Sequence, residues 1–410
     1  MSTRIFSFLF LFILVEIYCF QAFKTVFSKK PFAKKLYIWL HVALYLSLIG
    51  TFFLLPETRG VIGMVISTII VGLIVPKSLV IVFLFAEDII RWGRWSSKKV
   101  FQHPPAQGEK SDKVIPRSEF LSKVALATAG IPFIGIADGI IREKYNFQVR
   151  RVQIPIKNLP PQFEGFTITQ ISDIHTGSFD SKKSVKAGIE MVNEQDSDLI
   201  LFTGDLINNR IEEIKGYEDM LRQLYAREGV YSTLGNHDYG DYYHWHSEQE
   251  KADHFKRVVA THGQLGWNLL KNQNHIFTRD ESTLALIGVE NWGEKVFTRY
   301  GNLSEAVKGT ESAQVKILMS HDPTHWDWQI RKEQPDIQLT LAGHTHGSQI
   351  GVEIPGVVKW SPAKYLFDQW AGLYRKGDQQ IYVNRGFGFI GFSGRVGIPP
   401  EITVIELVKE

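Results

Sequence analysis

Cysteine is almost absent from this chain, which contains a single one, Cys19, among 410 residues. An intramolecular disulfide is therefore excluded, and the sequence carries no record of the redox compartment in which the protein works. A metal site built from several thiolates is excluded for the same reason. Any metal site in this chain has to use imidazole, carboxylate or amide ligands.

The sequence also lacks a strong charge of either sign, since its formal net charge at pH 7 is +3. It has no stripe of basic residues interleaved with aromatic ones and no recognition-helix pattern, so we expect no nucleic-acid partner. Internal repeats and low-complexity tracts are absent as well. The average composition, with 44% hydrophobic residues, is ordinary, but it conceals two unlike parts of the chain.

Long apolar runs occupy the first part. They cover about residues 5–23, 36–55 and 61–86, and each is long enough for a helix to cross the hydrocarbon core of a bilayer. The third run contains Pro76, which fits either one kinked span or two shorter pieces. We therefore predict a transmembrane region over residues 1–100, with the lipid bilayer as a partner and a multi-pass location in the cell membrane.

The next segment, residues 101–119, contains several prolines and mixed charges and is predicted to be a flexible linker. Residues 120–141 leave two interpretations open. Their apolar part, from Val124 to Ile141, is just long enough to form a fourth span. The sequence from Arg117 to Lys123 also resembles a twin-arginine export signal, with Ser118 at the position of the second arginine.

Charge in the loops predicts an orientation. Basic residues gather between the first two runs and again after the third, namely Lys24, Lys29, Lys30, Lys34, Lys35, Arg91, Arg94, Lys98 and Lys99. These loops should face the cytoplasm, which places the amino terminus outside. We favour a fourth span, and with it an extracytoplasmic carboxyl-terminal domain, although the basic residues after Ile141 count against this crossing.

The remaining residues, 150–410, contain four clusters of metal-ligand residue types, each after a run that reads as a buried strand. The clusters are Asp173-Ile174-His175, Gly204-Asp205, Gly235-Asn236-His237-Asp238 and Gly343-His344-Thr345-His346-Gly347. Helix-compatible stretches separate the first three, at the spacing of a βαβ unit. Because open α/β sheets place their sites at the carboxyl ends of the strands, the clusters should meet there. Together they favour a two-metal site.

With these motifs, residues 150 to 408 resemble the calcineurin-like metallophosphoesterases. The motif order of that family is Asp-x-His, Gly-Asp, Gly-Asn-His-Asp/Glu, a lone His and Gly-His-x-His, and His321 supplies the lone His. The resemblance implies an α/β fold, a sandwich of mixed β-sheets flanked by helices, here preceded by a helical transmembrane region. It also implies a ligand set in which one metal is held by Asp173, His175 and His346, the other by Asn236, His321 and His344, and both by Asp205.

The residue types agree with that assignment. Carboxylate, imidazole and amide ligands suit Mn²⁺, Fe or Zn²⁺ better than Ca²⁺ or Mg²⁺, so two such divalent ions are the expected cofactors. Two ions about 3.5–4 Å apart can share a hydroxide and orient it for in-line attack on phosphorus. The expected reaction is hydrolysis of a phosphodiester, a phosphomonoester or a pyrophosphate.

Further site residues follow from this chemistry. His237 is predicted to protonate the leaving oxygen, because it follows a metal ligand and imidazole titrates near neutral pH. Asp238 either orients that ring or caps the turn. Arg385, with Arg395 as a second candidate, either contacts substrate oxygens through its guanidinium fork or is an ordinary surface arginine. The segment from Tyr239 to Trp245 forms either an aromatic wall for the substrate or a packed loop.

Several functions fit these features. A membrane-anchored, dinuclear-metal phosphoesterase acting on a phosphorylated small molecule or a lipid-linked substrate is favoured. The branch of the family that the chain resembles includes UDP-2,3-diacylglucosamine pyrophosphatases of lipid A synthesis, which is an alternative. A metal-binding receptor or scaffold without turnover would predict loss of a ligand or of His237, and all are present. A transporter finds little support, since Glu16 is the one acidic residue in the first three predicted spans. The oligomeric state is left open.

Overall fold

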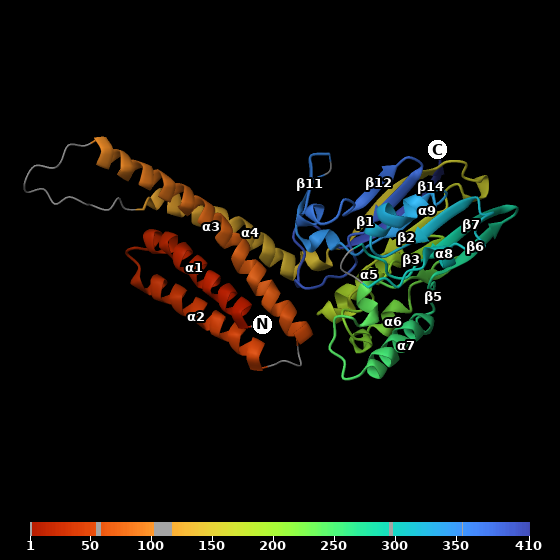
Figure 1. Ribbon diagram of the computed structural model, residues 1–410, viewed down its shortest axis with the longest axis horizontal. Helices are drawn as coiled ribbons and strands as arrows, with labels where there is room; N and C mark the ends of the chain where they lie inside the picture. The colour runs from red at the N-terminus through yellow and green to blue at the C-terminus, as the bar shows by residue number, and fades with distance from the viewer. Residues whose placement is uncertain (1, 55–58, 102–116, 295–297, 355) are drawn as a thin grey trace, which may run out of the picture. The chain divides into compact units, whose positions relative to one another are not determined.

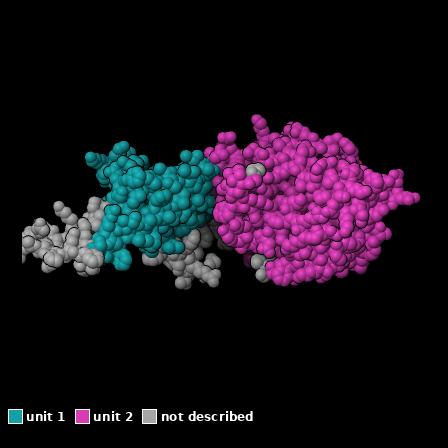
Figure 2. Space-filling view, turned by 90° about the horizontal axis from the view of Figure 1, so that it is seen from above, with its two compact units in different colours: residues 1–137 teal, residues 138–410 magenta. Residues whose placement is uncertain are grey.

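The computed structural model describes residues 2–54, 59–101, 117–294, 298–354 and 356–410. The chain divides into two compact units, residues 1–137 and residues 138–410 (Figure 2). We call the first the helical unit and the second the sandwich unit. Most of the predicted linker, residues 101–119, lies outside the described residues.

The helical unit consists of long helices. They are α1 (Ser2–Val26), α2 (Pro31–Leu54), α3 (Arg59–Phe101) and α4 (Glu119–Ile141), the last of which runs into the sandwich unit (Figure 1). The predicted spans 5–23 and 36–55 correspond to α1 and α2. Helix α3 continues through Pro76, so the third apolar run is one helix and not two shorter pieces.

Two segments among the described residues are long and apolar enough to cross a membrane, Ile66–Ser97 and Glu119–Tyr145. The first overlaps the third predicted run and extends beyond its end. The second contains residues 120–141, so in length and composition this segment qualifies as a further span.

A polar cluster connects the helices of the helical unit. The Glu16 carboxylate on α1 accepts hydrogen bonds from the hydroxyls of Tyr37 and Tyr45 on α2, the latter at 2.7 Å. It also forms an ion pair with the ammonium group of Lys77 on α3. All the partners of the carboxylate in this cluster therefore come from neighbouring helices of the same unit.

The sandwich unit contains two six-stranded sheets (Figure 1). In spatial order the first sheet is β1 (Gln148–Ile156), β14 (Glu401–Lys409), β2 (Thr167–Ile171), β3 (Leu199–Phe202), β4 (Val230–Ser232) and β5 (Asn268–Leu269). The second is β12 (Gly372–Lys376), β13 (Gln379–Val383), β9 (Leu339–Ala342), β8 (Val315–Met319), β7 (Ser282–Gly288) and β6 (Gln273–Arg279). A separate hairpin consists of β10 (Val352–Ile354) and β11 (Val358–Trp360).

Both sheets are mixed. Strands β2, β3, β4 and β5 pair in parallel, whereas β14 is antiparallel to β2. In the second sheet β7, β8, β9 and β13 are parallel, with β6 and β12 antiparallel at the edges. The short helices of this unit are α5 (Lys182–Asn193), α6 (Glu218–Leu221), α7 (Glu248–Gln264), α8 (Leu303–Ala306) and α9 (Arg331–Glu333).

The side chains of each strand point alternately to the two faces of its sheet, and this alternation explains the layers of the sandwich unit. Leu199 and Leu201 of β3 join the core between the sheets, which also contains Ile317 of the second sheet. Ile200 and Phe202, which point the other way, pack under the helices of the outer layer. Because both faces are covered, these strands are apolar throughout, as the sequence predicted. The predicted α/β sandwich of two mixed sheets flanked by helices is confirmed.

The sandwich unit begins earlier than the predicted residue 150. Glu143 accepts hydrogen bonds from the backbone N–H of Gly397 at 3.0 Å, and the buried Phe147 ring lies 4.4 Å from that of Phe387. These contacts make the residues before β1 part of the core. Sequence reasoning missed them because their partners lie far away in the chain.

Candidate metal centre

The predicted ligands all follow carboxyl ends of strands. Asp173 comes after β2, Asp205 after β3, Asn236 after β4, His321 after β8 and His344 after β9. Backbone hydrogen bonds tie the loops to one another, among them Asp173 N–H to the Gly204 carbonyl at 2.9 Å and Gly343 N–H to the His321 carbonyl at 2.9 Å. The parallel strands thus deliver these loops to one edge, as the sequence predicted.

Several ligand residues have a strained backbone. The φ angles of Asp173, His175, Asp205, His344 and His346 are 52°, 50°, 62°, 71° and 50°. Residues other than glycine rarely adopt this left-handed conformation, which costs on the order of 1–3 kcal/mol each. Such strain persists where the surrounding structure holds it, and it gathers at functional sites.

Two glycines allow the loops to approach closely. A Cβ atom at Gly343 would lie 1.9 Å from Ser172 Oγ and 2.3 Å from Asp173 Oδ2. A Cβ atom at Gly235 would lie 2.2 Å from Asp205 Oδ1. Any other residue at either position would displace a carboxylate of the centre, which explains why the motifs are framed by glycine.

The structure brings the predicted ligands into two buried groups. In one, atoms of Asp173, His175 and His346 lie within 4.8 Å of one another, and the same holds for Asp205, His321 and His344 in the other. The groups adjoin, because Asp205 Oδ2 is 3.5 Å from His175 Nε2 and 3.1 Å from His321 Nε2. One carboxylate oxygen therefore reaches both.

Asn236 offers a further ligand atom. Its side-chain nitrogen donates a hydrogen bond to the Tyr242 hydroxyl at 2.9 Å. Its Oδ1 is buried and has no hydrogen-bond partner among the described residues. An unpaired buried carbonyl is costly, and a bound cation would satisfy it. The donor set therefore fits the two divalent ions that the sequence predicted.

Backbone carbonyls orient the histidine rings. His175 Nδ1 faces the carbonyl of Ile207 at 3.2 Å, and His321 Nδ1 faces that of Thr203 at 2.8 Å. A carbonyl only accepts, so each Nδ1 carries the hydrogen and each Nε2 presents a lone pair to the centre. His344 Nε2 lies 3.8 Å from Asp322 Oδ2, which turns its Nδ1 towards the cluster.

Burial and neighbouring charges shift the pKa values of the ligand carboxyls and imidazoles. Burial raises the pKa of the Asp173 and Asp205 carboxyls, but the imidazoles beside them outweigh it and hold both pKa values below the ordinary one. Burial lowers the pKa of His175 to about 3. Burial also lowers the pKa of His321, but Asp205 and Asp173 raise it to about 10, so a cation has to compete with a proton there.

His237 lies beside the two groups. Its backbone N–H donates to Asp205 Oδ1 at 2.9 Å, and its Nδ1 is 2.6 Å from the Asn208 carbonyl. The ring is edge-on to that of His175, with 5.0 Å between centroids. The partner that orients the ring is therefore a backbone carbonyl, which residue types in a sequence do not reveal.

Asp238 has the contacts of a turn cap. Its carboxylate accepts from the backbone N–H groups of Asp205, Leu206 and Gly235 at 2.9, 2.9 and 2.8 Å. Of the two predicted roles, these contacts match turn capping rather than orientation of His237. The carboxylate fixes the loop that carries Asp205.

Arg385 lies inside the protein, and its role as a substrate contact stays a prediction. Its guanidinium is 2% exposed and forms ion pairs with Glu401 and, at 2.7 Å, with Glu353. Arg385 follows β13, whereas Glu401 begins β14 of the other sheet and Glu353 lies on β10, so these charges meet only in the folded unit. Arg395 is also buried, and it donates to the backbone carbonyls of neighbouring residues, with Nη2 3.3 Å from His346 Nδ1. These hydrogen bonds hold in place the loop beside the predicted metal ligand His346.

The aromatic segment divides between the two predicted roles. Tyr239 is buried and stacked on Tyr300, with 3.7 Å between ring centroids. Tyr243 packs against Trp245 at 4.7 Å. Tyr242 is 47% exposed, and its ring lies 4.6 Å from that of His237. Most of the segment is thus a packed loop, and Tyr242 alone among these residues contacts the centre.

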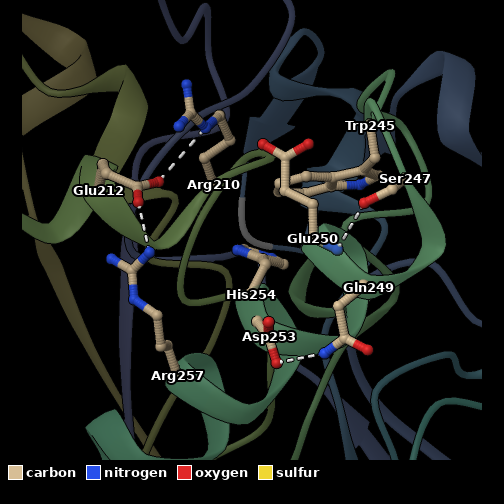
Figure 3. A pocket seen from close by; sticks show the side chains of 9 residues that line it. All are labelled: Arg210, Glu212, Trp245, Ser247, Gln249, Glu250, Asp253, His254 and Arg257. Atoms are coloured by element: carbon tan, nitrogen blue, oxygen red, sulfur yellow. Dashed lines mark hydrogen bonds and ion pairs between the residues drawn. The ribbon is translucent and has the colours of Figure 1, made fainter.

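A separate cavity of about 380 Å³ lies between the loop after β3 and helix α7 (Figure 3). Its lining includes two guanidinium groups. Glu212 forms an ion pair with each of them, 3.3 Å from Arg210 Nε and 2.6 Å from Arg257 Nη1. The cavity contains none of the predicted metal ligands, and its charges are largely balanced by one another.

Two family descriptions match this chain. Residues 3–144 match "Probable Calcineurin-like phosphoesterase, transmembrane domain", and residues 166–348 match "Calcineurin-like phosphoesterase". All the predicted metal ligands lie inside the second match. The first covers the helical unit and the predicted spans.

Individual relatives agree with these matches. The "Uncharacterized metallophosphoesterase YkuE" of Bacillus subtilis (strain 168) is 30% identical over 302 residues, which cover 72% of this chain and 98% of the relative. The "Transmembrane protein with metallophosphoesterase domain" of Danio rerio is 28% identical over 276 residues, 66% of this chain. This chain spans only 59% of the length of that relative.

Among solved structures, the NAD nucleotidase of Haemophilus influenzae aligns with a TM-score of 0.37 and 16% identity. The alignment covers 54% of this chain and 45% of the nucleotidase, a similarity too low to bear on function. The family matches and the bacterial relative are sufficient by themselves. This chain belongs to the calcineurin-like metallophosphoesterases, and its amino-terminal part is a transmembrane domain of that family.

Proposed function

We propose that the protein is a membrane-anchored phosphoesterase that works with two divalent metal ions. The observation that carries this proposal is the pair of buried ligand groups joined by Asp205 Oδ2. One cation would be held by Asp173, His175 and His346. The other would be held by Asn236, His321 and His344, with Asp205 shared between the two.

The chemistry follows from that arrangement. When bound, two such cations supply a hydroxide nucleophile at neutral pH and offset the charge of the phosphoryl oxygens. The protein holds the ligand atoms in place with strained loops and excludes bulk water from them. His237 donates a proton to the leaving oxygen from Nε2, since its Nδ1 faces the Asn208 carbonyl.

The metals are proposed to be Mn²⁺, Fe or Zn²⁺, because the ligands mix imidazole nitrogen with carboxylate and amide oxygen. The substrate is proposed to be a lipid-linked phosphodiester or pyrophosphate. The transmembrane domain favours it, because an enzyme fixed in the bilayer meets lipid-linked substrates at high local concentration. A UDP-diacylglucosamine is one substrate of this kind.

The decisive experiment uses the full-length protein in detergent, loaded with Mn²⁺. Chromogenic phosphomonoesters and phosphodiesters and UDP-2,3-diacylglucosamine are offered in parallel, with and without chelator. We expect chelator-sensitive hydrolysis of at least one class. A protein that binds two ions but hydrolyses none of these substrates would instead support the receptor or scaffold.

We further propose that the catalytic domain lies outside the cytoplasm. Supporting this orientation are the length and apolar composition of the segment Glu119–Tyr145 and the basic residues that follow the first and third apolar runs, the latter at the carboxyl-terminal end of α3. Protease added to intact cells or spheroplasts should then digest the domain while a cytoplasmic marker survives. Protection of the domain until the membrane is opened would place it in the cytoplasm.

A further inference from the structure

The amide of Asn236 has two ends of nearly equal size but opposite character. Oxygen Oδ1 accepts hydrogen bonds and binds cations, whereas the Nδ2 group carries two hydrogens and repels them. A rotation of the amide by half a turn exchanges the two ends. An asparagine ligand therefore works only while its NH₂ group is held away from the metal.

The structure supplies a partner for that NH₂ group. Tyr242 Oη lies 2.9 Å from Asn236 Nδ2, and Asn236 Oδ1 is buried with no hydrogen-bond partner in the described part of the chain. Gly240, with φ of 70°, reverses the chain just after the turn. This reversal brings Tyr242 back over the residues that precede it, where its ring lies 4.6 Å from that of His237.

We propose that Tyr242 is a positioning residue for the metal site that contains Asn236. Its hydroxyl keeps the amide nitrogen hydrogen-bonded while Oδ1 faces the cation. This role rests on the proposed function, since it requires a metal at Asn236. A tyrosine hydroxyl could also donate to Oδ1 of a rotated amide, but that amide would aim its N–H groups at the cation. With Oδ1 facing the cation and Nδ2 donating to Tyr242, both ends of the amide have a partner, and only this orientation gives the cation an oxygen ligand.

The neighbouring tyrosine provides a matched control. Tyr243 lies beside Tyr242 in the sequence, but its ring packs against Trp245 and under the Arg210 guanidinium, 5.1 Å away. Replacing either tyrosine with phenylalanine removes only a hydroxyl. Tyr242→Phe should therefore affect metal binding, whereas Tyr243→Phe should not.

The test is a titration of the full-length protein in detergent with Mn²⁺, followed by equilibrium dialysis and metal analysis. Loss of a group that orients a ligand typically lowers metal affinity by about 10–100-fold. We expect Tyr242→Phe to weaken one of two Mn²⁺ sites by this factor and to leave the other unchanged. The electron paramagnetic resonance signal of coupled Mn²⁺ pairs should decrease at a loading that gives full pairs in the wild type.

A second variant separates orientation from general damage. Aspartate at position 236 presents two equivalent oxygens, so it needs no partner to choose between its ends. In an Asn236→Asp background, Tyr242→Phe should therefore leave Mn²⁺ affinity unchanged. A loss that persists in this background, or that weakens both sites together, would overturn the proposal.

The outcomes separate this inference from the proposed function. If the wild type binds fewer than two Mn²⁺ ions, the two-metal function fails, and this inference fails with it. If the wild type binds two ions and Tyr242→Phe binds them as tightly as Tyr243→Phe, the function stands and the positioning role is wrong.

Discussion

The helical unit and the sandwich unit both enclose ionisable side chains, but their clusters are satisfied in different ways. In the helical unit the Glu16 carboxylate receives Lys77, Tyr37 and Tyr45, and the side chains of the ion pair are 15% and 11% exposed. Each of these donors has its acceptor within the cluster. In the sandwich unit, carboxylate oxygens and imidazole nitrogens converge on common points, and Asn236 Oδ1 is left unpaired.

This difference separates a structural role from a ligand site. Charges that neutralise one another within a cluster satisfy each other and leave no atom that needs a ligand. Lone pairs that converge repel one another unless a proton or a cation lies between them, and at His321 a metal ion has to displace the proton that Asp205 and Asp173 favour. Convergent acceptor atoms, and not burial of charge alone, therefore mark the site in this protein.

The strongest test of this difference between the two clusters is to remove Asp205, the group shared by both ligand sets. Asp205→Ala should reduce metal-dependent hydrolysis to the background rate, because Asp205 Oδ2 lies 3.5 Å from His175 Nε2 and 3.1 Å from His321 Nε2, closer to both than Asp173 Oδ1 at 4.0 Å. The measurement is the rate on a chromogenic phosphodiester with Mn²⁺. Asp219→Ala, whose side chain is 93% exposed on α6, serves as the control. Hydrolysis that survives both Asp205→Ala and chelation would end the two-metal hypothesis.

The next largest effect should come from a residue beside the ligands. If His237 protonates the leaving oxygen, His237→Ala should lower kcat by roughly 10²–10⁴ on substrates with poor leaving groups. Nitrophenolate leaves with little help, so nitrophenyl esters should be affected less. Bound metal should remain, and the exposed His246→Ala should behave as the wild type. Equal losses on both kinds of substrate, or loss of metal, would assign His237 a different role.

Substitutions in the Glu16 cluster of the helical unit should change the stability of the protein and leave its catalytic rate unchanged. Glu16→Gln leaves the Lys77 ammonium without its carboxylate, and because the pair is only partly buried the cost should lie below the value of about 3–5 kcal/mol for a fully buried pair. We expect a lower Tm for the detergent-solubilised protein and an unchanged kcat on a soluble substrate at 25 °C. The double variant Glu16→Gln with Lys77→Met should recover part of the Tm. A change in kcat with Tm unaltered would contradict the structural role.

The smallest expected effect on stability comes from the more exposed cluster around Asp327. Burial raises the pKa of Asp327, but hydrogen bonds from Lys376, Arg331 and Gln369 outweigh it and lower the pKa. A lowered pKa stabilises the fold above the unfolded pKa, near 4, and this stabilisation is lost as the pH falls through the folded value. Asp327→Asn should therefore cost roughly 1 kcal/mol or less at pH 7.

Thermal unfolding at two pH values checks this prediction. The difference in Tm between the wild type and Asp327→Asn should shrink between pH 7 and pH 3, because below about pH 4 the unfolded chain binds a proton at Asp327 that the folded carboxyl, with its lowered pKa, resists. A difference that grows on acidification would mean that the carboxylate destabilises the fold.

Prediction from the sequence succeeded where the signal is local. The apolar runs before Asp173, Asp205, Asn236 and His344 are buried strands, because strands covered on both faces need apolar residues at consecutive positions. Residue types alone do not reveal a contact that depends on a distant partner. From residue types alone Arg385 is a candidate substrate contact, and only the packing of the two sheets reveals its ion pair with Glu401 at the start of β14.

The amino-acid sequence by itself determined the ligand types, their order, the strand before each of them and the apolar helices at the amino terminus. These follow from residue chemistry and from periodicity over a few neighbouring positions. The tertiary structure decided which atom of each ligand faces the centre. Carbonyls at Thr203, Ile207 and Asn208 and the Tyr242 hydroxyl choose among ring nitrogens and amide ends. These choices depend on hydrogen bonds between loops that only the folded sheets bring together.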